Sequence, residues 1–382
     1  MITNFGINAS RARSGGGISH LVGIMNELGS CREHFKLIHV WSYKELLDAL
    51  PNHSWLIKHE VQELNFSLIK QLWWEKYKLP KALHQMNCEI LLNIDAGSIC
   101  RFRPAVTMSR DMLSYESIEM KRYGFSRGRL RLIILKFIQN RSFKSSDGVI
   151  FLTKYAAEKI QATCGQLKNI SVIPHGVDLQ FKNLKKSKKD NIIDKISCLY
   201  ISNALPYKHQ WHVINALILL RKKGYPVELN LVGGGEGAAQ KRLNASLSKI
   251  SKDQDFVMQH KYVPKSELVD FLNEADLFIF ASSCENMPNT LLEAMASGLP
   301  IACSDRGPMP EILGKAGLYF DPEVPESIAE CVSKIIDNPE SSLELAFEAK
   351  QLSKQYSWKR CAMETVSFLD EVANLNKKSY QK

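Results

Sequence analysis

The sequence lacks the features that mark several common protein classes. No apolar run approaches the ~18 residues that a membrane-spanning helix needs, and no basic region followed by an apolar one opens the chain, so neither a span nor a signal peptide is expected. Internal repeats, His-Glu-x-x-His and Cys-x-x-Cys are also absent, which argues against a solenoid and against common zinc sites. What is present is an ordinary globular composition, 45% hydrophobic and 24% charged, in 382 residues, enough for about two domains.

Cysteine is present without a pairing pattern. The sequence has nine cysteines, an odd number, and several of them stand within apolar runs. We therefore expect buried thiols in a reducing cytoplasm rather than a disulfide or zinc framework.

The positive charge is concentrated in one region. The net charge is +10, and residues 101–150 alone hold eleven basic and four acidic side chains. A local excess of this kind indicates an anionic partner, which could be a phospholipid surface, a phosphorylated substrate or nucleic acid.

Residues 127–140 in this region predict a basic amphipathic helix. Its apolar positions, which fit one helical face, are Leu130, Ile133, Ile134, Phe137 and Ile138. Its basic positions, a predicted membrane patch, include Arg127, Arg129, Arg131 and Lys136. Two compatible interpretations stay open: the helix lies on anionic lipid, or it packs on a sheet with its basic face outward.

Short apolar runs alternate with longer amphipathic stretches, which predicts an α/β architecture with parallel sheets. The runs expected to be strands are residues 89–94, 105–108, 148–152, 170–173, 196–201, 227–232, 277–281 and 300–303. Helices are expected at 211–223, 266–275 and 289–297. A lysine-rich stretch with few apolar residues marks 179–195 as a solvated linker between two halves of similar size.

Three motifs follow strands in the second half. A turn after residues 196–201 presents Lys208, which can act as a point charge for phosphate. A glycine loop from Gly233 to Gly235 follows residues 227–232 and frees backbone N–H groups for an anion. The third motif runs from Glu285 to Pro300. Asn289 or Thr290 can cap its helix, whose amino end suits a diphosphate, while carboxylates there suit sugar hydroxyls. A surface lysine, a tight turn and a capped helix with Glu293 exposed are the plainer interpretations.

Together these motifs resemble the retaining glycosyltransferases of family 4 (group 1), which have the GT-B fold. The family's Glu-x7-Glu segment stands here as Glu285 to Pro300, with Asn-Met-Pro in place of Gly-Phe-Gly. Ile173 to Asp178 and Ser304 to Leu313 resemble two further loops of the family, and Ser14 to His20 resembles its first glycine loop. The resemblance implies two Rossmann-like domains facing a central cleft. We assign residues 1–178 to the first domain, 179–195 to the linker, 196–357 to the second domain and 358–382 to a helix crossing back.

The resemblance implies a role for each matching residue. Lys208 would neutralise the donor diphosphate, although its usual arginine partner is replaced by Asn203. Glu293 would hold the nucleotide ribose, and Glu285 would lie near the donor sugar and the reacting face. The remaining predicted donor-binding residues are Gly16, Gly17, Gly233, Gly234, Asn289 and Thr290.

The first half departs from the family at one position. Many relatives have His-Asp after the strand at 105–108, whereas this sequence has Arg110 and Asp111. Arg110 could contact the donor phosphate or an anionic acceptor. Asp111 could orient an acceptor hydroxyl, as a third candidate catalytic residue beside Glu285 and Lys208, or it could cap its own loop.

The resemblance implies a metal-independent hexosyl transfer with retention, from a nucleotide-diphosphate sugar such as a UDP-sugar to a glycan hydroxyl. No metal or cofactor is expected, and the Asp-x-Asp triplet at 253–255 is discounted because polar sequence precedes it. The expected acceptor is lipid-linked or lipopolysaccharide-type, in envelope polysaccharide biosynthesis. The expected place is the cytoplasm, peripheral on the inner face of the cytoplasmic membrane, without nucleic acid as a partner. A nucleotide-sugar 2-epimerase and a non-catalytic membrane- or nucleic-acid-binding protein are the alternatives.

Overall fold

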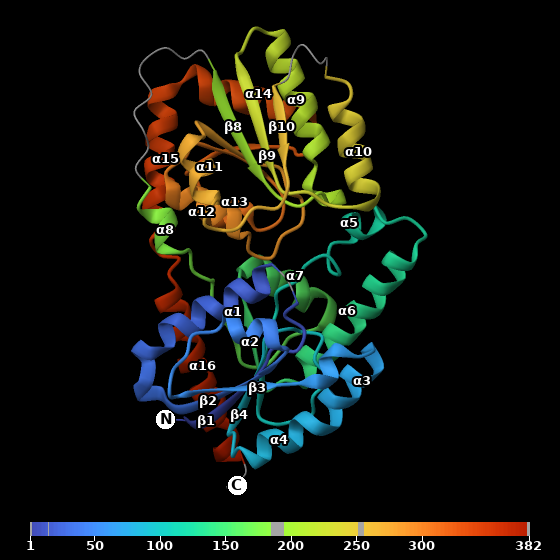
Figure 1. Cartoon of the computed structure of the whole chain (residues 1–382), viewed down its shortest axis with the longest axis vertical. Helices are drawn as coiled ribbons and strands as arrows, with labels where there is room; N and C mark the ends of the chain where they lie inside the picture. The colour runs from blue at the N-terminus through green and yellow to red at the C-terminus, as the bar shows by residue number, and fades with distance from the viewer. Residues whose placement is uncertain (1, 14, 185–194, 251–255, 380–382) are drawn as a thin grey trace. The chain divides into compact units, whose positions relative to one another are not determined.

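The computed structural model describes residues 2–13, 15–184, 195–250 and 256–379. The chain divides into two units: the first is Met1–Gly176 with Tyr356–Lys382, and the second is Val177–Gln355. Each unit has its own parallel sheet covered by helices (Figure 1). Most of the predicted lysine-rich linker, 185–194, and the triplet at 253–255 lie outside the described residues.

The first unit is built on a seven-stranded sheet in the order β3-β2-β1-β4-β5-β6-β7. All its neighbouring strands are parallel. The strands are β1 (Ile2–Asn8), β2 (Phe35–Ser42), β3 (Leu56–Glu60), β4 (Ile90–Asn93), β5 (Ala105–Met108), β6 (Gly148–Phe151) and β7 (Ile170–Val172). The four residues of β4, of β5 and of β6 are all buried, as expected for strands covered on both faces.

Helices connect these strands. They are α1 (Gly16–Glu27), η1 (Leu28–His34), α2 (Lys44–Ala49), η2 (Gln62–Asn65), α3 (Leu68–Trp73), η3 (Trp74–Lys78), α4 (Leu79–Gln85), α5 (Ser117–Lys121), α6 (Arg127–Ser145), α7 (Lys154–Cys164) and α16 (Trp358–Ser379). Side chains fix three of the starts: Ser126 Oγ accepts from the N–H of Arg129, Thr153 Oγ1 accepts from the N–H of Ala156, and Ser357 Oγ accepts from the N–H of Arg360. The last helix, α16, packs on α1, η1 and β4 within this unit.

The second unit has a six-stranded parallel sheet in the order β10-β9-β8-β11-β12-β13. Its strands are β8 (Ile196–Ile201), β9 (Val227–Val232), β10 (Val257–His260), β11 (Leu277–Phe280), β12 (Ile301–Ser304) and β13 (Leu318–Phe320). Its helices are α8 (Leu179–Lys182), η4 (Pro206–Lys208), α9 (Gln210–Lys222), α10 (Gly237–Leu247), α11 (Leu268–Glu274), α12 (Asn289–Ser297), α13 (Met309–Leu313), α14 (Pro325–Asp337) and α15 (Pro339–Ser353).

Each sheet reverses its strand order once. In the first unit the order turns between β1 and β4, and in the second it turns between β8 and β11. Loops that follow the strands on either side of such a reversal part from one another, so ligands of parallel α/β sheets bind outside the carboxyl ends there. These two places are where a functional site is expected in each unit.

The α/β prediction with two parallel Rossmann-like sheets is confirmed. All eight predicted strands exist within a residue or two of their expected bounds. Five further strands were not predicted: β1, β2, β3, β10 and β13. Four of them carry polar residues, such as Asn4 and Asn8 in β1 or Lys58 and His59 in β3, and β13 is only three residues long, so none has the longer uninterrupted apolar run that marked the others.

Three smaller expectations can also be compared with the structure. The beginning of the predicted linker is wrong in detail, because Leu179–Lys182 form α8 and bury Phe181. The nine cysteines are all free and eight of them are buried. Among the described residues, no helix combines the length and the apolar character needed to cross a bilayer.

Candidate functional site

Lys208 and Glu285 form an ion pair at the strand-order reversal of the second unit. Lys208 ends η4, after β8, and Glu285 lies in the loop after β11, so the carboxyl ends of two adjacent strands bring them together. Their side chains are only 14% and 15% exposed. The hydroxyl of Tyr200 donates to the backbone oxygen of Lys208 over 2.6 Å and fixes the turn. The predicted cation therefore sits where its charge is neutralised by a carboxylate that an anionic ligand would displace.

Glu293, on α12, is buried and has one oxygen without a partner. Its Oε1 lies 3.6 Å from Lys265 Nζ, and Lys265 also pairs with Asp178 over 2.7 Å. Its Oε2 has no hydrogen-bond partner among the described residues. Burial raises the pKa of Glu293 to about 7, against the attraction of Lys265. The plainer interpretation of an exposed Glu293 is wrong, and the buried free oxygen suits a ligand hydroxyl.

The amino end of α12 differs from the prediction in its cap. Asn289 and Thr290 are the first two helical residues, and Pro288 is the N-cap, without a side-chain hydrogen bond. Proline has no side-chain oxygen, so the N-cap residue itself offers no acceptor to the N–H groups of the first turn. The end of the helix is as predicted, with Gly298 in the left-handed conformation after Ser297. An amino end without a side-chain cap at its N-cap residue suits an anion, because its dipole end is positive.

The glycine loop after β9 is shaped by a neighbouring loop. Gly233 has φ +113°, and a side chain there would meet the backbone oxygen of Ser202 at 2.5 Å. Gly235 is similarly close to Ala204, whereas Gly234 is nearly open. The plainer interpretation therefore accounts for Gly233 and Gly235, because they let this loop pack on the exposed loop of Asn203. Gly234 and Asn203 stay predicted donor contacts.

In the first unit, Arg110 packs on the predicted glycine loop. A side chain on Gly17 would meet the guanidinium of Arg110 at 2.6 Å and would displace it from its present position, while Gly16 begins α1 beside it. Arg110 follows β5, in the carboxyl-end region of the same sheet. Burial lowers its pKa to about 10, partly offset by Asp95 and Asp111, and the guanidinium stays charged at neutral pH. A charged guanidinium beside a glycine loop, whose backbone no side chain covers, is a suitable contact for an anion.

Asp111 caps its own loop. Its Oδ1 accepts from the N–H of Leu113 over 3.0 Å, which is one of its two predicted roles. Burial raises the pKa of its carboxyl, and nearby Asp95 acts in the same direction. Its role toward an acceptor hydroxyl stays a prediction.

Sequence reasoning missed a polar cluster at the reversal of the first unit. Asn8, at the end of β1, donates to Glu75 Oε1 over 2.8 Å and to Asn93 Oδ1, at the end of β4, over 3.1 Å. Glu75 Oε2 accepts from Arg11 over 2.9 Å. An asparagine at the end of an apolar strand was a usable signal for Asn93, but nothing in the sequence relates Glu75 in η3 to β1.

The apolar face predicted for α6 does not pack on the sheet. Leu132, Gln139, Ser142 and Phe143 are the buried residues of the helix, whereas Leu130, Ile133, Ile134 and Phe137 are all at least half exposed. The interpretation in which those apolar residues contact the sheet is therefore wrong. Gln139 and Ser142 share the inner side with Leu132 and Phe143 instead, and the apolar stripe shares the outer surface with Arg127 and Arg131.

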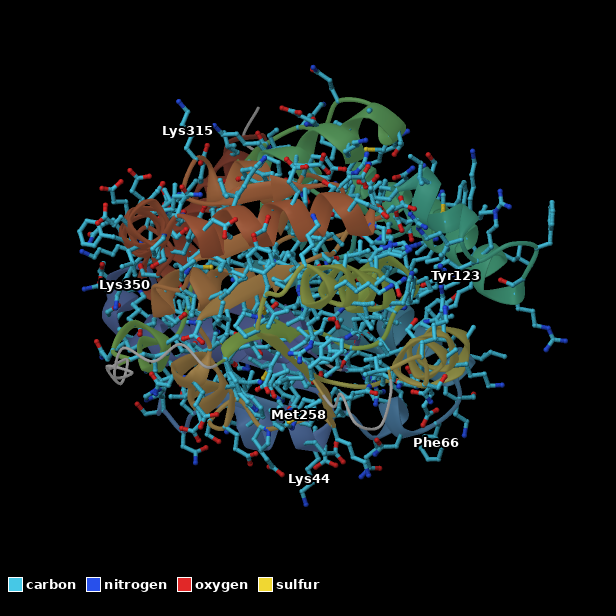
Figure 2. All side chains as sticks on the ribbon, turned by 90° about the horizontal axis from the view of Figure 1, so that it is seen from above. Lys44, Phe66, Tyr123, Met258, Lys315 and Lys350 are labelled. Atoms are coloured by element: carbon cyan, nitrogen blue, oxygen red, sulfur yellow. The ribbon has the colours of Figure 1, made fainter. Side chains whose placement is uncertain are left out.

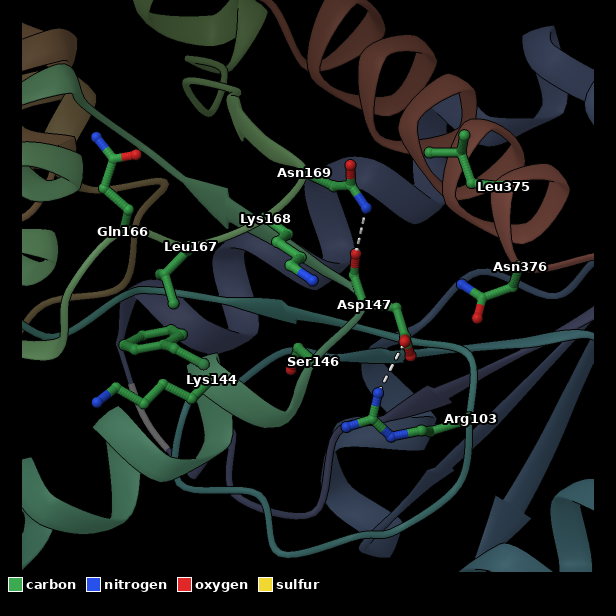
Figure 3. A pocket seen from close by; sticks show the side chains of 11 residues that line it. Arg103, Lys144, Ser146, Asp147, Gln166, Leu167, Lys168, Asn169, Leu375 and Asn376 are labelled. Atoms are coloured by element: carbon green, nitrogen blue, oxygen red, sulfur yellow. Dashed lines mark hydrogen bonds and ion pairs between the residues drawn. The ribbon is translucent and has the colours of Figure 1, made fainter. Parts of the chain in front are cut away.

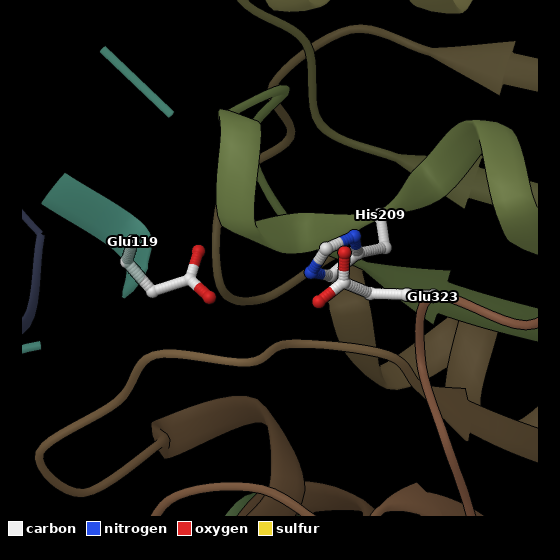
Figure 4. A group of neighbouring side chains, drawn as sticks. All are labelled: Glu119, His209 and Glu323. Carbon is white, nitrogen blue, oxygen red and sulfur yellow. The ribbon is translucent and has the colours of Figure 1, made fainter. Parts of the chain in front are cut away.

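One pocket lies apart from these sites, and one hydrogen bond of a histidine lies beside the Lys208 site. A pocket of about 400 Å³ in the first unit is lined by residues such as Arg103, Asp147 and Asn169, which precede β5, β6 and β7 at the amino ends of the strands (Figure 3). In the second unit, His209 Nε2 shares a 2.7 Å hydrogen bond with Ser283 Oγ. Figure 4 draws His209 and Glu323 with Glu119, which belongs to the first unit, so the three are not assigned to one site. The expectation of no metal stays a prediction.

The two sheets define the GT-B class of fold, with two Rossmann-like domains. Solved structures agree over nearly the whole chain. The sucrose-phosphate synthase of Thermosynechococcus elongatus matches with a TM-score of 0.74 over 99% of both chains at 14% identity. The Alr3699/HepE protein of Anabaena, in complex with UDP, matches with a TM-score of 0.70 over 97% of this chain and 100% of its own at 17% identity. At these identities the likeness establishes the fold.

The sequence of the second unit is similar to one family. Residues 179–352 match the model of the glycosyl transferases group 1. The O-antigen chain mannosyltransferase B of Escherichia coli is a relative, 28% identical over 173 residues, which are 44% of this chain and 44% of the relative. The match thus spans less than half the length of that relative. The predicted resemblance to group 1 glycosyltransferases is confirmed.

Proposed function

We propose that the protein transfers a hexosyl residue from a nucleotide-diphosphate sugar to a hydroxyl group of a glycan acceptor, with retention of the anomeric configuration. The observation that carries the proposal is the set of charged groups outside the carboxyl ends of β8 and β11. Lys208 offers a cation, α12 offers an uncapped amino end, and Glu293 offers a buried free oxygen. A diphosphate joined to a ribose needs these three kinds of contact.

In this reaction the group that needs stabilisation is the leaving diphosphate. When the bond from the sugar carbon to the diphosphate oxygen breaks, the electron pair stays on the diphosphate, whose negative charge grows. Lys208 and the amino end of α12 stabilise that charge. The acceptor hydroxyl forms the new bond on the same face, through an oxocarbenium-like state, and its proton passes to the departing oxygen. Glu285 then faces the donor sugar once the diphosphate has drawn Lys208 away from it.

UDP is the proposed nucleotide, supported by the Anabaena neighbour, whose structure holds UDP. A lipid-linked or lipopolysaccharide-type acceptor is supported by the named activity of the Escherichia coli relative and by α6. That helix exposes four large apolar side chains among basic residues, the composition of a surface that lies on anionic lipid. We accordingly propose a peripheral position on the inner face of the cytoplasmic membrane.

A panel of nucleotide sugars tests the proposal. The purified protein is incubated with each donor and with lipid-linked glycans, and released UDP or GDP is measured together with the configuration of the new linkage by NMR. Nucleotide release that depends on the acceptor, with retention, is the expected result. Interconversion of the donor sugar itself would indicate the 2-epimerase instead. Membrane binding without any turnover of a donor would indicate the non-catalytic alternative.

A further inference from the structure

A second exposed apolar surface lies on the first unit, away from α6 in the sequence. Five large side chains, Phe66, Leu68, Ile69, Trp73 and Tyr77, are between 49% and 78% exposed. They come from α3, from the residues just before it and from η3 (Figure 1; Phe66 is labelled in Figure 2). Three of them are aromatic. We call these five residues the aromatic–lysine face, together with Lys70, Lys76 and Lys78.

The opposite side of the same helical segment is fixed in the interior. Trp74, Glu75, Leu79 and Leu83 are at most 5% exposed. Glu75 is held by Asn8 and by Arg11, which bind its two oxygens. Rotation of the segment to bury Trp73 would break these contacts and bury lysines instead. The segment therefore presents its apolar residues outward as a consequence of how its inner side is anchored.

The charges of this surface are positive. Lys70 lies 4.3 Å from the ring centroid of Phe66, Lys76 lies 4.9 Å from that of Tyr77, and Lys78 lies 5.3 Å from that of Trp73. Glu63 pairs with Lys78, and the carboxylate of Glu75 is turned inward, so Lys70 and Lys76 are not neutralised by either acid. Long lysine stems can lie along apolar surface while their ammonium groups reach outward.

This composition favours a lipid surface over a protein partner. Tryptophan, tyrosine and lysine are the side chains that concentrate where hydrocarbon meets headgroups. Protein–protein interfaces are depleted in lysine. We propose that the aromatic–lysine face is a bilayer-contact surface that inserts its apolar side chains among anionic phospholipids. The inference deepens the proposed function, on which it rests for the choice of a membrane as the occupant.

Trp73 provides a probe that the protein already contains. All six tryptophans lie in the described residues, and the other five are at most 8% exposed, whereas Trp73 is half exposed. The full-length protein is mixed with vesicles of phosphatidylglycerol and phosphatidylcholine whose acyl chains carry bromine, a short-range quencher of tryptophan. We expect quenching of the part of the tryptophan emission that comes from Trp73. The quenching should be lost in Trp73→Phe, which keeps an aromatic side chain at this position and should still bind the vesicles.

Vesicle sedimentation gives the second measurement. Ile69→Ser with Trp73→Ser should weaken binding by about tenfold or more, because two large apolar side chains no longer leave water. Phe347→Ser with Leu343→Ser is the matched control, since these residues of α15 in the second unit are each 64% exposed. The control pair should leave binding unchanged, and unchanged far-ultraviolet circular dichroism verifies that both variants fold.

The outcomes separate this inference from the proposed function. Wild-type protein that sediments with the vesicles while its Trp73 emission stays unquenched would overturn the inference, even if sugar transfer is found. Equal losses in the α3 pair and in the control pair would overturn it as well. Quenching of Trp73 in a protein that turns over no donor would support the surface and contradict the transferase.

Discussion

The two strand-order reversals differ in how their polar side chains are satisfied. In the second unit, Glu293 keeps a buried oxygen without a partner in the described structure, and Lys208 is held by a single carboxylate. In the first unit, Asn8 donates to both Glu75 and Asn93, so that the oxygens and amide groups of the cluster largely satisfy one another. An unmatched buried polar atom lowers stability until a ligand supplies its partner. The second reversal is therefore arranged to receive ligand atoms, and the first is arranged to hold its loops.

The largest effect should come from Lys208→Ala. Removing the cation that we propose to face the leaving diphosphate should lower kcat by about 10²–10³-fold, as for loss of one group that stabilises developing charge. Lys315→Ala is the control, because Lys315 is an exposed lysine of the same unit (Figure 2). Steady-state kinetics with the active donor gives the comparison. Equal kcat values for the two variants would remove Lys208 from the site.

Glu75→Ala tests the other side of the comparison. It removes a buried carboxylate, leaves Arg11 without its carboxylate partner and takes one of its acceptors from Asn8, which should lower the free energy of unfolding by about 3 kcal/mol. Urea unfolding curves provide the measurement. Glu33→Ala, at an exposed position of the same unit, should change it little. A loss of less than about 0.5 kcal/mol at Glu75 would show that the cluster does not hold the loops.

Glu293→Ala should weaken binding of the nucleoside diphosphate by about 1–3 kcal/mol without unfolding the protein. The pKa of Glu293 is raised to about 7, so below that pH the carboxyl holds a proton that must leave before both oxygens can accept hydrogen bonds from the proposed ribose hydroxyls. Affinity should therefore rise with pH up to about 7, and Glu293→Gln should abolish that rise. Calorimetry at pH 5.5 and pH 8 measures both.

The same raised pKa of Glu293 affects folding. Between about pH 4.5 and about pH 7 the folded state binds more protons than the unfolded state, so the contribution of this group to the free energy of unfolding falls as pH rises through that window.

The two reversals also differ in how far the sequence predicts their polar side chains. In the second unit, Lys208 and Glu285 each follow an apolar strand within a few residues, and the segment from Glu285 to Pro300 has a spacing that resembles the Glu-x7-Glu motif of the family. The sequence therefore predicts that these two side chains lie close together. The ion pair of Lys208 and Glu285 spans 77 positions, yet both ends carry a local motif. Glu75 carries none, because its role depends on the direction in which η3 packs on β1.

Helix α6 shows a second limit of sequence patterns. The alternation of apolar and basic residues predicted the helix, but it did not tell which face points inward. The structure buries Gln139 and Ser142 and exposes Ile133 and Phe137, against the usual rule that apolar residues face the core. Hydrophobic periodicity identifies an amphipathic helix, and only the neighbouring elements decide whether its apolar side faces protein or lipid.

Changing the arginines of α6 should have a moderate effect on membrane binding. Arg127, Arg129 and Arg131 replaced together by Ser should weaken binding to anionic liposomes by about tenfold, since only part of the ~1 kcal/mol per residue is realised when not every side chain reaches the surface. High salt should release the wild-type protein. Lys44, Lys241 and Lys315 replaced together by Ser give a control of equal charge. Equal weakening in both triple variants would mean that net charge, and not α6, attracts the membrane.

The smallest effect is expected from chelation. In the proposed site Lys208 and the amino end of α12 already supply the positive charge that a divalent ion would give to a diphosphate. Turnover in the presence of EDTA should therefore remain within about twofold of the untreated rate, a change of under 1 kcal/mol in the barrier. The sharper form of the test repeats the chelation in Lys208→Ala, which has lost its cation. If Mn²⁺ or Mg²⁺ restores part of the turnover of that variant while EDTA does not change the turnover of the wild type, then Lys208 stabilises the charge on the diphosphate in place of a metal ion. Complete loss of wild-type turnover on chelation, reversed by either ion, would instead mean that the charge on the leaving group is balanced by a metal, and that the pair with Glu285 has another role.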